Sequence, residues 1–217
     1  MKGMQTEPRP DLAHAFDTIG ARYDEVFNSK PGQVAATEWI LEQLGNRDER
    51  PLVIDIGCGT GLPTARQLID GGCEVVGVDI SPVMIEIARD NVPEAIFVER
   101  DLSDLDGLHP VGSRFDAATA YFSLLVLHRA DVEKTIDAIY HVLHPGAFFA
   151  IGMVEGDTDY LLRDFLGEKV PLTAYPRDQL GALLSAHGFT VADLRVESWA
   201  GPDHQPQTHV YAVCVRG

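Results

Sequence analysis

Three glycines at alternate positions are the residues of this chain best suited to hold a ligand. Gly57, Gly59 and Gly61 follow the apolar residues 52–56 and precede a segment with helical spacing. Because glycine has no Cβ, such a turn lets backbone N–H groups and the N-terminus of the following helix approach a ligand closely. The sequence therefore predicts a ligand-binding turn between a strand and a helix.

The spacing of these glycines and the acid before them indicate the charge of the ligand. A dinucleotide-binding turn has the pattern G-x-G-x-x-G and would need its third glycine at position 62, where this chain has leucine. Asp55 lies two residues before the first glycine, and its negative charge disfavours a phosphate and favours a cation. The turn therefore favours a nucleoside that carries an ammonium and a sulfonium group over a pyrophosphate.

Acidic residues follow three consecutive predicted strands, at Asp55, Asp79 and Asp101. Ligands of open α/β sheets bind at the carboxyl ends of the strands, so the three acids predict one site. Asp79 lies 22 residues beyond Gly57, a spacing that lets its carboxylate accept hydrogen bonds from both hydroxyls of a ribose. We expect Asp101 to accept a hydrogen bond from the exocyclic amine of adenine, and Asp55 to face the positive end of an amino acid moiety.

Strands and helices alternate along the segment that carries these acids. Repeated units of this kind build a doubly wound parallel sheet. Two further strands near the end, 189–196 and 208–215, are joined by a short link and should pair antiparallel. The predicted fold is a Rossmann-like α/β sheet of seven strands, mostly parallel with an antiparallel last strand. The other strands are expected at 52–56, 74–79, 95–98, 115–121 and 147–154, and the helices at 34–44, from Pro63 to Gly71, from Pro82, from Asp131 to Leu143 and at 177–187.

The chain is predicted to form one domain, residues 1–217. Apolar residues at positions 12, 16, 19, 23 and 27 follow helical spacing with a break at Gly20, so residues 1–46 are expected to form a helical cap. Residues 51–154 would form the cofactor-binding half, and residues 155–217 the acceptor side with the antiparallel C-terminal strands. The segment 155–175 interrupts the strand–helix alternation, and we expect it to line an acceptor site together with the cap.

Composition and charge disfavour several classes of protein. The 217 residues carry a formal net charge of −16, whereas nucleic acid binding needs a basic face, so no nucleic acid partner is expected. No apolar run approaches the roughly 20 residues of a membrane span, and no signal peptide is recognisable. Cys58, Cys73 and Cys214 are scattered and odd in number, which fits a reducing cytoplasm, and no Cys/His cluster has zinc spacing. A cytoplasmic location is expected, and the oligomeric state stays open.

Five segments together resemble the class I S-adenosylmethionine-dependent methyltransferases. They are VIDIGCGTG at 53–61, VVGVDIS at 75–81, RDL at 100–102, FDAATAYFSLLVLH at 115–128 and HVLHPGAFFAIG at 141–152. The resemblance extends over about residues 12–217 and is closest to small single-domain bacterial enzymes that methylate small molecules. It implies a seven-stranded sheet with an antiparallel last strand, S-adenosylmethionine as methyl donor and S-adenosylhomocysteine as product.

The resemblance also implies which residues bind the cofactor. The segment ARYD at 21–24 is similar to the family's cap helix, whose tyrosine closes over the methionine end. Grouped by the part of the cofactor that they would contact, the implied residues are Tyr23, Asp55, Gly57, Cys58, Gly59, Gly61, Ala120 and Tyr121 for methionine, Asp79 for ribose, and Ile80, Met84, Asp101 and Leu102 for adenine.

The acceptor side is less specific. A base is needed only if the acceptor loses a proton, as a hydroxyl or an ammonium group does. His128, just beyond the fourth strand, is the expected base, because a neutral imidazole is available near pH 7. Tyr160, Phe165 and Tyr175 are expected to line the acceptor site. The predicted reaction is O- or N-methylation of a small molecule whose identity the sequence does not give.

Two other classes of protein stay open at this point. An NAD-dependent oxidoreductase would share the strand–turn–helix unit, although the missing third glycine and Asp55 argue against it. A protein that binds the cofactor without methylating, such as a cyclase or a partner subunit, would keep the same motifs. A purely structural role is also open for Tyr23, Ile80, Met84 and His128.

Overall fold

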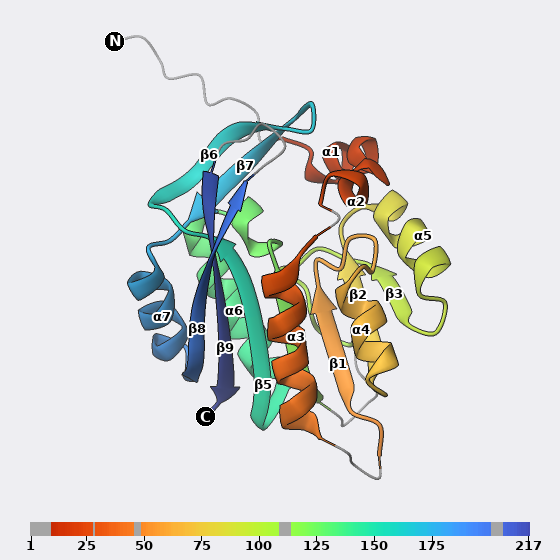
Figure 1. The fold of residues 1–217 in the computed structure, drawn as a ribbon, viewed down its shortest axis with the longest axis vertical. Helices are drawn as coiled ribbons and strands as arrows, with labels where there is room; N and C mark the ends of the chain where they lie inside the picture. Colours follow the sequence, from red (N-terminus) through yellow and green to blue (C-terminus); the bar gives the residue numbers. More distant parts are fainter. Residues whose placement is uncertain (1–9, 28, 46–48, 109–113, 201–205) are drawn as a thin grey trace.

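A seven-stranded sheet with the order β3-β2-β1-β4-β5-β9-β8 forms the centre of the molecule (Figure 1). The computed structural model describes residues 10–27, 29–45, 49–108, 114–200 and 206–217. The predicted α/β class and the seven-stranded sheet are confirmed. The strands are β1 (Leu52–Ile56), β2 (Glu74–Asp79), β3 (Ile96–Glu99), β4 (Phe115–Tyr121), β5 (Leu143–Val154), β8 (Phe189–Ala200) and β9 (Pro206–Arg216).

All strands of this sheet but one run in the same direction. β1 pairs in parallel with β2 and β4, β2 with β3, and β4 with β5. β9 runs antiparallel to both of its neighbours, β5 and β8, as the sequence predicts for the last strand. Its His209 pairs with Val154, so this residue of β9 lies at the carboxyl end of β5.

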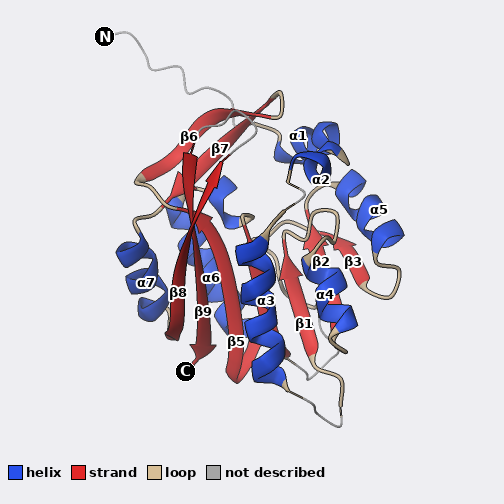
Figure 2. Ribbon diagram, viewed as in Figure 1, coloured by secondary structure: helices blue, strands red, loops and turns tan. Residues whose placement is uncertain are grey.

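Helices cover both faces of the sheet, because the pleat sends alternate side chains to opposite sides. Val53 and Val75 belong to the apolar core under α3 (Pro31–Leu44), α4 (Thr64–Asp70) and α5 (Pro82–Asn91). Ile54 and Val76 belong to the core under α6 (Arg129–Val142) and α7 (Arg177–Ala186). Figure 2 shows α3 and α4 in front of the sheet and α6 behind it. Among the described helices, none has the length and apolar character needed to cross a membrane.

Two short helices and a hairpin lie over the carboxyl ends of the parallel strands (Figure 1). They are α1 (Leu12–Ile19), α2 (Arg22–Val26) and the pair β6 (Thr158–Phe165) and β7 (Glu168–Ala174). Asp17 of α1 accepts hydrogen bonds from the Ser81 hydroxyl at 2.6 Å and the Val83 N–H at 3.3 Å. The cap is thereby fixed to the start of α5, next to the end of β2.

The N-terminal cap is smaller than the sequence pattern indicates. α3 begins at Pro31, three residues before the predicted start, because proline suits the first turn of a helix. It packs against α4, β5 and β9 and therefore covers the sheet. Of the segment 1–46 that is predicted as a cap, α1 and α2 lie over the strand ends. The segment 155–175, for which no regular structure is predicted, forms the hairpin of β6 and β7.

The start and the end of α6 also differ from the prediction. Its N-cap residue is His128, so Asp131 lies in the first turn and is not the cap that the sequence suggests. The helix ends at Val142 and β5 starts at Leu143, although Pro145 and Gly146 predict a break between the two elements. Leu143 already pairs with β4, and this pairing ends the helix before the proline.

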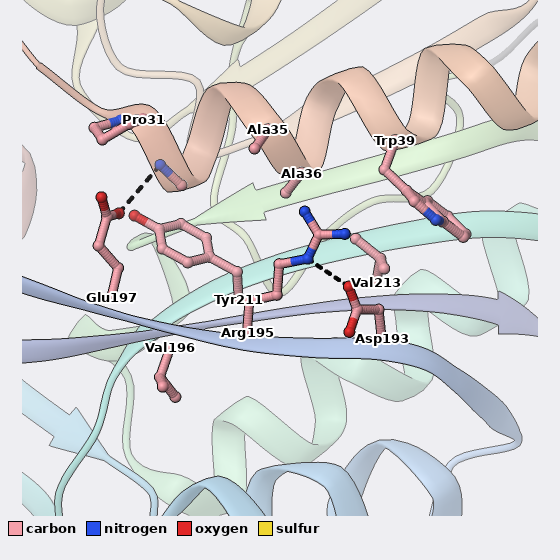
Figure 3. Close-up of a pocket in the computed structure, with 11 residues that line it drawn as sticks. Pro31, Ala35, Ala36, Trp39, Asp193, Arg195, Val196, Glu197, Tyr211 and Val213 are labelled. Carbon is pink, nitrogen blue, oxygen red and sulfur yellow. Dashed lines mark hydrogen bonds and ion pairs between the residues drawn. The ribbon is translucent and has the colours of Figure 1, made fainter.

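The N-terminus of α3 is held by a strand from far along the chain. Oε2 of Glu197 in β8 accepts a hydrogen bond from the Gly32 N–H at 3.1 Å, as a capping side chain would. Figure 3 shows this contact beside a cavity of about 310 Å³ between α3, β8 and β9. A Cβ on Gly32 would lie 2.3 Å from the ring of Tyr211 and 2.6 Å from Glu197. Only glycine therefore lets α3 approach β9 this closely.

We predict opposite effects for alanine at two helical glycines. Gly32→Ala should lower the free energy of unfolding by about 1–3 kcal/mol, because the buried Tyr211 ring must move. Gly181→Ala in α7 is the control, since its Cβ would meet Leu194 at an ordinary 3.8 Å. It should raise stability by about 0.5–1 kcal/mol. Urea unfolding measures both, and an unchanged stability of Gly32→Ala would contradict the tight approach.

Candidate active site

The glycine turn after β1 adopts a backbone conformation that favours glycine at three positions. The φ angles of Gly57, Gly59 and Gly61 are 71°, 52° and 78°. A Cβ on Gly57 would lie 2.1 Å from the Cβ of Ser123, whose hydroxyl donates a hydrogen bond to the Ile56 carbonyl at 2.6 Å. The end of β4 therefore packs directly on the turn.

One side of this turn is open. A Cβ on Gly59 would meet no atom within 4 Å, whereas the N–H of Gly59 donates a hydrogen bond to Oδ2 of Asp79 at 2.9 Å. Oδ1 of Asp79 accepts a second hydrogen bond from the Ser81 N–H at 3.0 Å. Burial raises the pKa of Asp79, and these backbone donors oppose that rise. Both carboxylate oxygens are held in place, and each keeps a lone pair for a further donor.

Asp55 is a second buried carboxyl group beside the turn. It is 3% exposed, and the Thr119 hydroxyl donates a hydrogen bond to its Oδ1 at 2.7 Å. Burial raises its pKa to about 7, helped by the charge of Asp79 and opposed by Thr119 and Lys30. A cation bound next to Asp55 would stabilise its ionised form. The acid therefore suits the ammonium group that the sequence pattern suggests.

Lys30 brings a positive charge from the cap to this site. Its Nζ donates hydrogen bonds to the Leu62 carbonyl at 3.0 Å and to Oδ1 of Asp24 at 3.4 Å, and it lies 4.9 Å from the ring centre of Tyr23. Burial lowers the pKa of Lys30, although Asp24 and Asp55 favour its charged form. The sequence did not single out this lysine, because nothing local distinguishes a lysine before a helical proline from a surface residue.

Tyr23 lies where the cap covers the acids. Burial raises the pKa of its phenol, and the negative charges of Asp24 and Asp79 add to this rise. Its ring packs on Phe27 with the ring centres 4.9 Å apart and lies 6.4 Å from Phe165 of β6. The structure thus brings together two residues that the sequence placed on different sides of the site, Tyr23 on the cofactor and Phe165 on the acceptor.

The other residues expected around the methionine part of the cofactor have structural contacts. Cys58 is buried, its N–H donates to the Val78 carbonyl at 2.9 Å, and burial raises the pKa of its thiol well above the usual value. A Cβ on Gly61 would lie 3.2 Å from Val92. Ala120 and Tyr121 end β4 and are buried, and the Tyr121 hydroxyl lies 3.1 Å from Oγ1 of Thr37 on α3. Their contacts with the methionine part of a cofactor stay predictions.

The residues expected around adenine are divided between buried and exposed positions. Met84 is buried at the start of α5, Ile80 is half-buried before it, and Leu102 is buried in the core under α6. Asp101 is exposed, and its Oδ1 accepts hydrogen bonds from the N–H and the hydroxyl of Ser103 at 2.8 and 2.6 Å. Asp101 thus stabilises its own turn, and its contact with adenine stays a prediction.

His128 and its neighbours form a separate group under the hairpin. The ring of His128 stacks on Tyr160 with the centres 3.7 Å apart, and its Nδ1 lies 3.6 Å from Oδ1 of Asp159. Tyr175 packs under Arg129, and its buried hydroxyl has no hydrogen-bond partner among the described residues. The described contacts of His128, Tyr160 and Tyr175 thus lie under the hairpin, and none of them is with the glycine turn.

The cavity in Figure 3 is not this site. It is lined by residues of α3, β8 and β9, among them Trp39, Arg195 and Tyr211, and by no residue of the glycine turn. Arg195 pairs with Asp193 on its wall. The open side of Gly59, between Asp55, Asp79 and the cap, is therefore the candidate active site.

Comparison with known proteins identifies the family of this chain. The sequence model of a methyltransferase domain matches residues 53–146. An uncharacterized methyltransferase of Synechocystis is 33% identical over 156 residues, which cover 69% of this chain and 70% of that protein. The chain belongs to the class I S-adenosylmethionine-dependent methyltransferases.

Solved structures show how widely this methyltransferase fold is used. A 1,6-didemethyltoxoflavin N1-methyltransferase of Burkholderia thailandensis superposes with a TM-score of 0.70 at 23% identity, over 94% of this chain and 87% of that one. The cyclase SpnF superposes with a TM-score of 0.71 at 20% identity, over 96% and 98% of the two chains. At these identities the likeness establishes the fold alone.

The methyltransferase cofactor is S-adenosylmethionine, and the residues present fit it. The open side of Gly59 gives the backbone room for a ligand, and the fixed carboxylate of Asp79 can accept hydrogen bonds from a diol. The buried acid of Asp55 suits an ammonium group. A pyrophosphate would face two buried carboxyl groups, so the NAD-dependent alternative is disfavoured by the charge of the site.

We predict that Asp55 makes the unliganded methyltransferase less stable as the pH rises. The folded chain keeps the Asp55 proton up to about pH 7, whereas the unfolded chain loses it near pH 4. Stability from this group is therefore complete at low pH and is lost as the pH rises through about 7. Between pH 5 and pH 8 the loss should be about 2–3 kcal/mol. In urea unfolding, the free energy of unfolding of Asp55→Asn should rise by this amount relative to the wild type between pH 5 and pH 8. A difference between the two that does not change with pH would contradict the assignment.

Proposed function

We propose that this methyltransferase transfers a methyl group from S-adenosylmethionine to an oxygen or nitrogen atom of a small molecule. The observation that carries the proposal is the fixed carboxylate of Asp79 beside the open face of Gly59, covered by a cap. The cap and the hairpin lie over the strand ends (Figure 1), and a covered site of this kind supports a small-molecule acceptor.

The residues around the turn would divide the cofactor between them. Asp79 would accept hydrogen bonds from the ribose hydroxyls, and Ile80 and Met84 would pack on the adenine. Asp55 would face the methionine ammonium, while Lys30 would face the methionine carboxylate. This arrangement pairs every charge of the amino acid moiety with an opposite charge in a buried site, as desolvated charges require.

The protein's main contribution to the reaction would be alignment. When bound, S-adenosylmethionine supplies a methyl group on a positively charged sulfur, which an acceptor atom attacks in line. Positive charge on sulfur is lost in this step, so holding the acceptor and the methyl carbon in line supplies most of the rate enhancement. Tyr23 and Lys30 would close the cap over the methionine end and exclude water. His128 stays a candidate base for acceptors that lose a proton.

A protein that binds the cofactor without methylating is the second candidate. The observation behind it is that a cyclase, SpnF, shares this fold over almost the whole chain, so the fold alone does not determine the chemistry. Calorimetric titration with S-adenosylhomocysteine and with NAD would test cofactor binding. Formation of S-adenosylhomocysteine from S-adenosylmethionine in the presence of a library of small phenols, amines and heterocycles would test methyl transfer. Binding without turnover on any acceptor would favour the second candidate, and NAD binding would contradict both.

Asp79 provides a direct test of ribose recognition. Asp79→Ala should weaken the binding of S-adenosylhomocysteine by about 2–3 kcal/mol, because charge-assisted hydrogen bonds to two hydroxyls are lost. Asp90 is an exposed acid in α5, and Asp90→Asn should leave the affinity unchanged. Calorimetry gives both affinities. Unchanged binding by folded Asp79→Ala would mean that another residue holds the ribose.

Lys30 can be tested with two ligands that differ only in the amino acid part. Lys30→Met should weaken the binding of S-adenosylhomocysteine by about 1.5–3 kcal/mol. It should leave the affinity for 5′-deoxy-5′-methylthioadenosine, which has no amino acid carboxylate, within about twofold. Lys134→Met on the exposed face of α6 is the control. An equal loss for both ligands would show that Lys30 acts only through the structure of the cap.

A further inference from the structure

Six aromatic side chains from different elements contact one another over the strand ends. We call them the aromatic belt: Tyr23, Phe27, Phe122, Phe165, Trp199 and His209. Phe27 stacks on Phe165 at 5.6 Å and on Trp199 at 5.2 Å, with interplanar angles of 21° and 22°. Trp199 stacks on His209 at 5.2 Å and 22°. Phe165, Phe27, Trp199 and His209 thus form one stack of rings, and Phe122 lies against its His209 end.

Both ends of the belt meet the cofactor cradle. Tyr23 packs on Phe27, and the negative charge of Asp79 contributes to the raised pKa of the Tyr23 phenol. At the other end, Phe122 lies 4.6 Å from His209 and is followed by Ser123, the residue that packs on Gly57. An acceptor that receives a methyl group from a cofactor in the cradle must therefore lie against the belt.

Phe122 has an unusual backbone conformation that serves this arrangement. Its φ is 57°, in the left-handed region that non-glycine residues rarely adopt. The hydrogen bond from its N–H to the Gly152 carbonyl at 2.8 Å holds it there. The conformation turns the chain out of β4, and the Phe122 ring packs on His209 of β9. Strain of this kind persists where the surrounding structure fixes it and is concentrated at functional sites.

His209 is a polar member of the belt and is 8% exposed. None of the described residues makes a hydrogen bond with its ring. Burial lowers its pKa to about 4, so the ring is neutral at pH 7. One ring nitrogen can then accept a hydrogen bond. A ligand hydroxyl that reaches the ring would supply this hydrogen bond.

We propose that the aromatic belt binds the methyl acceptor, a planar conjugated small molecule with a hydroxyl group, and that His209 accepts a hydrogen bond from this hydroxyl. The proposal rests on the proposed function. Phe122 has only tilted and edge contacts with the described rings, so stacking on Phe122 would hold the plane of the acceptor. The hydrogen bond to His209 would set which oxygen faces the methyl group. The apolar rings favour a neutral acceptor, because a buried charge would have no partner among them.

Calorimetry with a flat and a puckered probe tests the stacking. In saturating S-adenosylhomocysteine, 2-naphthol should bind at least tenfold more tightly than decahydro-2-naphthol, which has the same skeleton without the planar rings. Phe122→Leu should remove most of this preference. Phe148→Leu is the matched control, because Phe148 contacts Trp39 and lies outside the belt. Equal binding of the two probes, or no binding of either, would overturn the proposal.

The hydroxyl contact is tested by a variant that keeps the ring. Wild type should bind 2-naphthol at least fivefold more tightly than 2-methoxynaphthalene, which has no hydroxyl proton to donate. His209→Phe should make the two affinities equal, whereas His141→Phe on the exposed end of α6 should not. If His209→Phe keeps the preference for the hydroxyl, His209 is not the acceptor's partner.

The affinity for S-adenosylhomocysteine is measured for every variant, and it separates the two proposals. Loss of cofactor binding by the wild type would contradict the proposed function. Normal cofactor binding without any preference for planar, hydroxyl-bearing probes would contradict the aromatic acceptor site alone. If Phe122→Leu does not fold, the two probe pairs and His209→Phe still decide.

Discussion

Two buried carboxyl groups beside one backbone turn set the main constraint on this structure. Asp55 and Asp79 lose most of their contact with water, and the negative charge of Asp79 adds to the cost of ionising Asp55. The Gly59 N–H, the Thr119 hydroxyl and the Lys30 ammonium offset part of that cost. A ligand with a positive charge and two hydroxyl donors would offset the rest, so the unliganded site is prepared for one kind of molecule.

The rest of the fold keeps these groups in place. The parallel strands β1 and β2 put both acids at one edge, and Asp17 of α1 fixes the cap to the helix that follows β2. The close contact of Ser123 with Gly57 ties the end of β4 to the turn. Because β9 is inserted between β5 and β8, it adds His209 to the same edge. The residues of the candidate active site and of the aromatic belt thus come from segments far apart in the sequence.

The local part of this arrangement could be predicted from the sequence. The glycine turn, Asp79 and the strands are visible because each depends on neighbours in the chain: an apolar run, alternate glycines, a serine cap. Lys30, Phe122 and His209 were missed, because their importance comes from contacts with distant segments. His128 is a plausible base by sequence position, but the structure stacks it on Tyr160 under the hairpin. The hairpin itself has neither a turn sequence nor an alternation of apolar and polar residues strong enough to reveal it.

The insertion of β9 leaves β8 at one edge of the sheet, where unpaired backbone groups invite another chain to add a strand. Asp193, Arg195 and Glu197 place charges at alternate positions of β8, and its register shifts between Val191 and Asp193. Charges and bulges of this kind oppose edge-to-edge pairing. At the opposite edge, β3 has only four residues, too few to template a long ladder. The order of the strands therefore comes with protection against aggregation at both edges.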